Sequence, residues 1–227
     1  MAQPGGAGPV KPETTFYRTQ QGVGFNARVE PVWTTFTQIE ASLGFFDRRR
    51  ERKKVERVID AVNTAVVGQK GNPGGWEKTT GDCVCHLRVA KMGMVRELKT
   101  WLKLGLDGQA EGRWPHLHVL RDRPCMMVPV RFAKPLSVDP GSGEEPLPVA
   151  SAPWVLDELT AINRNFRIDE TFALKKMVDF MDATDRDISI FEQRLGSQDG
   201  FWPKFAYVLM KKLADASVAK SLPAIFA

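Results

Sequence analysis

The stretch DRRRERKKVERVIDAVNTAVVG, residues 47–68, contains two kinds of helical sequence in one run. Its second half carries aliphatic side chains at the i, i+3, i+4, i+7 and i+11 spacing of a buried helical stripe. These side chains are Val55, Val58, Ile59, Val62 and Val66. Continued toward the N-terminus, the same stripe meets only charged residues. We therefore predict one long helix that starts at an Asp47 N-cap and ends at Gly68, with a first half that projects from the core.

The charged half of this helix dominates the electrostatics of the chain. Residues 48–57 include seven basic and two acidic side chains, and their net charge of +5 equals that of all 227 residues. The rest of the protein is therefore neutral in sum. A localised basic patch attracts acidic partners more strongly than a diffuse excess of charge does. We expect this patch to bind a partner through Arg48, Arg49, Arg50, Arg52, Lys53, Lys54 and Arg57.

The sequence as a whole predicts an α+β fold. Residues 1–30 have the composition of an extended or flexible N-terminal arm, and residues 31–227 that of a single globular domain. Within this domain we expect helices over 31–68, strands over 82–151 and helices again over 153–220. The expected sheet is small and antiparallel, with about three to five strands in the middle of the chain, packed by the N-terminal and C-terminal helices.

Local patterns place the individual elements. Alternating or β-branched segments predict short strands at 23–29, 83–90, 116–121, 126–132 and 147–151. Apolar residues at helical spacing predict further helices at 33–44, 94–106, 153–166, 169–183, 187–196 and 201–218. Pro153 stands in the first turn of one of these helices, where proline is well tolerated.

The cysteine content and the hydropathy pattern indicate a cytoplasmic protein. Three cysteines are too few for a disulfide scaffold, and a domain of this length can bury a core without such cross-links. No apolar run approaches the roughly 20 residues needed to cross a bilayer. We expect neither membrane association nor a cofactor.

All cysteines and histidines lie between Cys83 and Cys125. On the predicted strands, Cys83 and Cys85 share one face of the sheet, and His116 and His118 share a face of a second strand. A tetrahedral zinc site built from these four residues is one interpretation. We favour the other, in which the cysteines fill a core and the histidines lie at a strand edge, because a one-residue gap on a strand holds two sulfur atoms apart.

The segment PHLHVL, residues 115–120, also resembles the metal-binding motif of the HUH endonucleases, which cleave single-stranded DNA. The resemblance is confined to this short motif. It implies that His116 and His118 would hold a divalent cation against the scissile phosphate. It further implies that a tyrosine on a later helix would act as the nucleophile, and FAYVLMKK offers Tyr207 with Lys211 one turn further on.

No other pattern in the sequence assembles an active site. The sequence therefore favours a non-catalytic macromolecular-interaction protein, of the size and style of bacterial accessory, adaptor or immunity-like proteins. The expected partner is another protein, with Trp76 and Trp114 as aromatic anchors in turn-rich sequence. The alternative is a nucleic-acid-binding protein that uses the basic segment 48–57, alone or together with HUH chemistry.

Overall fold

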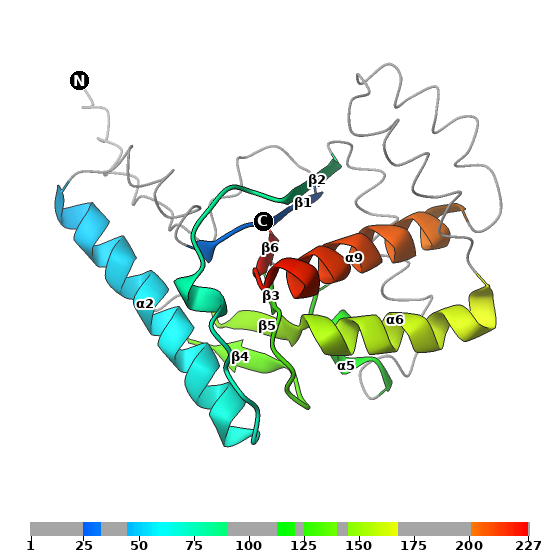
Figure 1. Cartoon of the computed structure of the whole chain (residues 1–227), viewed down its shortest axis with the longest axis horizontal. Coiled ribbons are helices and arrows are strands. Elements are labelled where there is room, and N and C mark those ends of the chain that lie inside the picture. Colours follow the sequence, from blue (N-terminus) through cyan, green and yellow to red (C-terminus); the bar gives the residue numbers. More distant parts are fainter. Residues whose placement is uncertain are drawn as a thin grey trace, which may run out of the picture.

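The computed structural model describes residues 25–32, 45–89, 113–120, 125–139, 145–167 and 201–226. The arm before residue 25 and the predicted helices at 33–44, 94–106, 169–183 and 187–196 lie outside the described residues. The described parts confirm an α+β fold, in which helices pack on a twisted sheet (Figure 1).

The sheet has six strands in the order β2-β1-β6-β3-β5-β4 and is larger than expected. The strands are β1 (Phe25–Val29), β2 (Cys85–Val89), β3 (Cys125–Val128), β4 (Leu136–Val138), β5 (Leu147–Ser151) and β6 (Ala224–Phe226). The prediction of an antiparallel sheet is wrong in one place, because β3 and β5 run parallel. All other pairs are antiparallel.

The parallel pair arises from the path of the chain between β3 and β5. After β3 the chain passes beyond the position of β5 and forms the edge strand β4. It then returns as β5, which fills the gap between β3 and β4. All residues of β3 and β5 are buried, as expected of strands covered on both faces.

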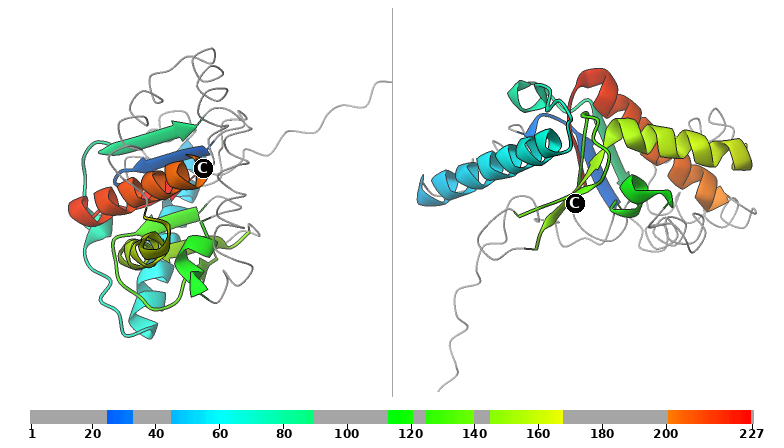
Figure 2. Two further views of the ribbon diagram at one scale, coloured as in Figure 1. Left: turned by 90° about the vertical axis from the view of Figure 1, so that its right-hand side faces the viewer. Right: turned by 90° about the horizontal axis from the view of Figure 1, so that it is seen from below.

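Helices cover both faces of the sheet (Figure 2). The helix α2 (Phe45–Gly68) and the short helix η1 (Trp76–Lys78) pack on one face, where Met126 and Val128 of β3 point. On the other face, Cys125 and Met127 contact a second apolar cluster. That cluster is shared with α5 (Pro115–His118), α6 (Ala152–Phe166) and α9 (Phe201–Lys220). None of the helices in the described ranges is long and apolar enough to cross a membrane.

The apolar stripe predicted in α2 is confirmed. Its five aliphatic residues are all buried against the sheet. The helix ends at Gly68 as predicted but starts at Phe45, so Asp47 lies within its first turn and is not its N-cap. Beyond the helix, the side-chain amide of Gln69 accepts from the Lys134 backbone N–H at 2.8 Å and donates to the Lys134 carbonyl at 2.9 Å.

At the junction between β5 and α6, the helix begins with a side-chain N-cap and a first-turn proline. The Ser151 side chain accepts a hydrogen bond from the Trp154 backbone N–H at 3.4 Å, and Pro153 occupies the first turn. The strand predicted at 147–151 and the helix predicted at 153–166 are both confirmed. Because α6 starts directly after a buried strand, its first turn lies at the carboxyl end of the parallel pair.

The short elements differ from the predictions in three ways. Residues 115–118 form the helix α5 where a strand was expected, and Pro115 at its start explains the difference. The strands β4 and β6 were not predicted, since each has only three residues and too few positions to show alternation. The strand expected at 126–132 covers only the first half of that range, because it ends before Pro129.

Candidate basic interaction surface

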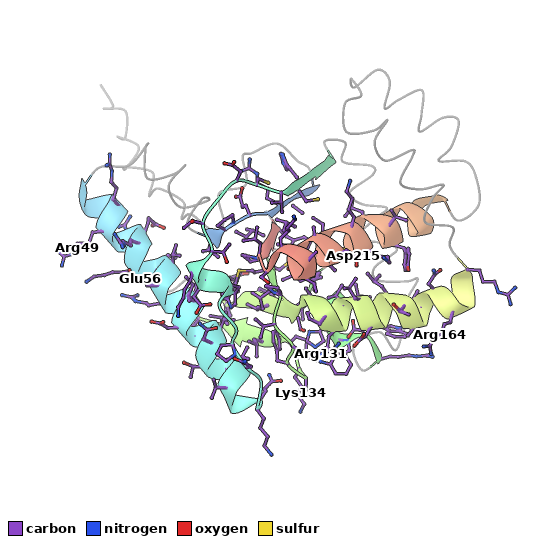
Figure 3. All side chains as sticks on the ribbon, viewed as in Figure 1. Arg49, Glu56, Arg131, Lys134, Arg164 and Asp215 are labelled. Atoms are coloured by element: carbon purple, nitrogen blue, oxygen red, sulfur yellow. The ribbon has the colours of Figure 1, made fainter. Side chains whose placement is uncertain are left out.

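The N-terminal half of α2 carries most of the predicted basic patch on its exposed side. The helix extends beyond the strands of the sheet in two perpendicular views (Figures 1 and 2). Figure 3 shows the Arg49 side chain directed away from the rest of the protein. We call the exposed cations of this half-helix the basic face. They are Arg48, Arg49, Arg50, Arg52, Lys53 and Arg57.

The opposite side of this half-helix is not exposed, which corrects the expectation of a fully projecting segment. Glu51 is 5% exposed and Lys54 is 4% exposed, so the buried side of α2 continues past Val55 as a charged strip. Lys54 was predicted to contact a partner, and its burial removes it from the candidate surface.

Arg49, Lys53 and Arg57 recur at every fourth position and form a row along the helix. Consecutive members are about 6 Å apart along the axis, since an α-helix rises about 1.5 Å per residue. The row lies opposite the buried stripe that contains Val58 and Val62. It is therefore the part of α2 most remote from the core.

Two carboxylates moderate the charge of the basic face. Glu56 lies 3.3 Å from the Arg52 guanidinium, one helical turn away, and Glu51 lies 4.0 Å from Arg50. Among the residues that the structure describes, no ion pair joins Arg49, Lys53 or Arg57 to an acid. The row consequently presents its charge to solvent.

The position of these cations is unfavourable for the helix itself. The N-terminal end of an α-helix carries a partial positive charge from the aligned peptide dipoles, and basic side chains there destabilise it. Arg48 lies in the first turn, and Arg49 and Arg50 follow directly. The helix dipole therefore does not account for arginines in this turn.

The tryptophans predicted as anchors are not both available. Trp76 is only 2% exposed and belongs to the cluster beneath α2, so its role as a partner contact is wrong. Trp114 is half-buried against the opposite cluster, with the Arg113 guanidinium 5.2 Å from its ring centre. The burial of Trp76 depends on the fold of the surrounding loop, which its turn-rich sequence does not reveal.

The cysteines and histidines predicted as an alternative zinc site are far apart in the sheet. Cys85 lies on the edge strand β2, with Cys83 just before it, whereas His116 and His118 lie on α5 beside β5 and α6. Three strands separate β2 from β5. In the described residues, no group of three or more His, Cys, Asp and Glu side chains is placed to hold a metal ion. Cys125 is buried in β3, as expected of a core residue.

His116 is fully buried and both of its ring nitrogens contact the backbone. Nδ1 accepts from the Ser151 N–H at 3.1 Å, and Nε2 lies 3.3 Å from the Ala133 carbonyl. The ring stacks on Trp154 and meets Phe132 edge to face. Burial lowers the pKa of His116 to about 4, so the ring is neutral near pH 7. His116 therefore joins α6, α5 and the loop before β4.

A carboxylate that the sequence analysis did not identify completes this cluster. The Glu158 side chain accepts from the backbone N–H groups of His116 at 3.1 Å and Leu117 at 2.8 Å. Burial raises the pKa of Glu158 to about 7, although these two hydrogen bonds act in the opposite direction. The sequence does contain a signal, because Glu158 shares the helical spacing of the buried residues Val155 and Ile162.

Tyr207 and Lys211, the nucleophile pair implied by the HUH resemblance, lie on α9 as predicted. Tyr207 is buried in the apolar cluster, and the Lys211 ammonium pairs with Asp215 at 2.7 Å. His116 and His118 lie on a helix, whereas the resemblance requires them on a strand. The contacts of the His116 ring also leave neither nitrogen directed at a cation.

The basic face of α2 is therefore the described surface that best fits a binding role. Comparisons with protein-family models, with curated proteins and with solved structures find no match.

Proposed function

We propose that the protein is a non-catalytic accessory protein that binds an acidic macromolecule through the basic face of α2. The observation that carries this proposal is the row formed by Arg49, Lys53 and Arg57. These three cations are exposed, lie opposite the buried stripe and have no acidic partner among the described residues. Exposed cations without an acidic neighbour in the described residues can attract an acidic partner.

A non-catalytic role is supported by the state of the titratable groups in the described core. His116 and Glu158 are buried, and both are engaged by backbone groups that join α5 to α6. The burial of Tyr207 within α9 likewise assigns it to packing. Their packing and hydrogen bonds account for their positions in the core.

We further propose that the protein acts in the cytoplasm. All three cysteines are free thiols, and burial raises the pKa of both the Cys83 and the Cys85 thiol. Free thiols without disulfide partners are typical of a reducing compartment, and the raised pKa values make these two thiols less reactive.

The proposal is tested with the triple variant Arg49→Glu, Lys53→Glu, Arg57→Glu in the full chain. The size of the complexes formed by the tagged protein is measured by size-exclusion chromatography of a gently prepared lysate. We expect the wild type to elute partly in assemblies larger than the free protein. The triple variant should elute at the size of the free protein, because charge reversal repels an acidic partner.

The matched control is Lys70→Glu, Lys78→Glu, Lys134→Glu, which makes the same change in net charge at exposed positions outside the basic face. This control should retain the large assemblies. Equal loss in both variants would show that net charge alone drives association. Equal retention in both would show that the basic face binds nothing.

A further inference from the structure

We propose that the partner of the basic face is duplex DNA, bound through its phosphates without sequence preference. This inference rests on the proposed function and names the class of partner. It follows from the chemistry, the spacing and the surroundings of the exposed cations on α2.

The chemistry of the face suits phosphate. Five of its six exposed cations are arginines, and Lys53 is the exception. The planar guanidinium donates two parallel hydrogen bonds to phosphate oxygens and is less strongly hydrated than an ammonium group. Solubility alone does not require arginine in place of lysine.

The spacing of the row suits a regular polyanion. Arg49, Lys53 and Arg57 project from one side of a straight element at intervals of about 6 Å. Successive phosphates repeat in the same way along a nucleic-acid strand, so neighbouring cations of the row can contact neighbouring phosphates.

The surroundings of the row argue against a protein partner. Between residues 48 and 57 every exposed side chain is charged, and the single apolar residue, Val55, is buried. Stable protein interfaces depend on a desolvated centre with aromatic or aliphatic anchors, and charged residues are depleted there. Contacts to phosphates require no apolar anchor.

The shape of α2 favours duplex DNA over duplex RNA. An α-helix with its side chains is about 10 to 12 Å across, and the major groove of B-DNA is about 12 Å wide. The major groove of an RNA helix is too deep and narrow for such an element. The end of α2 that carries the row extends past the strands of the sheet, so the sheet does not block its approach (Figures 1 and 2).

The test is fluorescence anisotropy of a labelled duplex DNA of mixed sequence titrated with the purified full chain. Three phosphate contacts predict a slope of log K against log salt of about −2.7. Binding should therefore weaken about 40-fold between about 50 and about 200 mM salt. An unrelated duplex DNA should bind equally well, and duplex RNA more weakly.

The decisive variant is Arg49→Gln, Lys53→Gln, Arg57→Gln, with Lys70→Gln, Lys78→Gln, Lys134→Gln as its control. The first should lose the salt-dependent binding, and the control should keep the wild-type slope. Each single change within the row should reduce the slope by about 0.9. Equal binding of both triple variants to DNA would overturn the inference.

A second measurement separates this inference from the proposed function. The lysate assemblies of the wild type are treated with DNase before chromatography. Their dissociation supports DNA as the partner. A different set of results would overturn the inference and leave the proposed function standing. In that case the assemblies resist DNase, they are absent with the variant Arg49→Glu, Lys53→Glu, Arg57→Glu, and the purified protein does not bind duplex DNA. If the row variant changes neither the assemblies nor DNA binding, both fail.

Discussion

Gly71 shows how a single residue permits close packing between the end of α2 and the loop after β3. A Cβ atom at this position would lie 2.8 Å from Val66 Cγ1 and 2.9 Å from the Arg131 carbonyl oxygen. We predict that Gly71→Ala lowers the free energy of unfolding by about 1 to 3 kcal/mol, the usual cost of overpacking.

The control for this prediction is Gly68→Ala, where a Cβ meets nothing within 4 Å. It should be neutral or slightly stabilising, because alanine restricts the unfolded chain. Urea denaturation measures both variants. Similar stabilities for the two would contradict the tight contact at Gly71.

His116 and Glu158 act on stability with opposite dependence on pH. In the unfolded chain His116 gains a proton near pH 6.5, whereas the folded ring stays neutral down to about pH 4, so its contribution is lost as the pH falls through this window. Folded Glu158 keeps its proton up to about pH 7, whereas the unfolded carboxyl releases it near 4.5. Its contribution is lost as the pH rises, and the two effects cancel between pH 4.5 and 6.5.

We predict that Glu158→Gln removes this compensation. The free energy of unfolding of the variant should increase with pH between 4.5 and 6.5, by up to about 1.4 kcal/mol per pH unit relative to the wild type. Urea denaturation at several pH values measures the slope. The double variant with His116→Gln should return to the slope of the wild type. A single variant with an unchanged slope would show that Glu158 is already ionised in the folded protein.

At the scale of elements, β6 joins two parts of the sheet that are remote in sequence. Ala224, Ile225 and Phe226 pair with β1 on one side and with β3 on the other, and all three are buried. We predict that deletion of residues 224–227 abolishes cooperative thermal unfolding, because β1 and β2 then lose their connection to β3.

Near-UV circular dichroism measures this loss of tertiary structure. Ser221→Gly is the matched control in the preceding turn. Ser221 has a positive φ of 53°, which glycine adopts without strain, so this variant should be as stable as the wild type or more so. A deletion variant that retains a cooperative transition would contradict the role assigned to β6.

The long elements could be predicted from the sequence, and the shortest could not. The stripe of α2 and the apolar spacing of α6 and α9 are local signals that extend over at least three turns. The strands β4 and β6 have three residues each and are defined by partners far away in the chain. The motif PHLH alternates like a strand, but Pro115 and the Glu158 carboxylate hold its backbone as a helix.

At the scale of the whole molecule, the basic face could be predicted from the sequence, but which of the candidate binding residues are buried could not. Exposed arginines in a charged run are evident from charge counting alone. The burial of Lys54 and Trp76 depends on what packs over them, and no local pattern contains that information. The sequence likewise placed cysteines and histidines in one interval of the chain, yet the strand order separates them.

Under the proposed function, α2 combines a segment that packs on the sheet with a segment that binds a partner. The buried stripe from Val55 to Val66 covers the sheet, and the exposed row Arg49, Lys53 and Arg57 lies on the opposite side toward the N-terminal end. Truncation in the stripe, as in Val58→Ala, should lower stability by about 1 to 4 kcal/mol, since the side chain is fully buried.

The free energy of unfolding of the variant Arg49→Glu, Lys53→Glu, Arg57→Glu is the most direct test of this division. The account predicts a value within about 0.5 kcal/mol of the wild type, as is usual for exposed substitutions. A loss as large as that of Val58→Ala would contradict it. The row would then be part of the fold, held by acidic groups of the same chain, and would not be a surface kept for a partner.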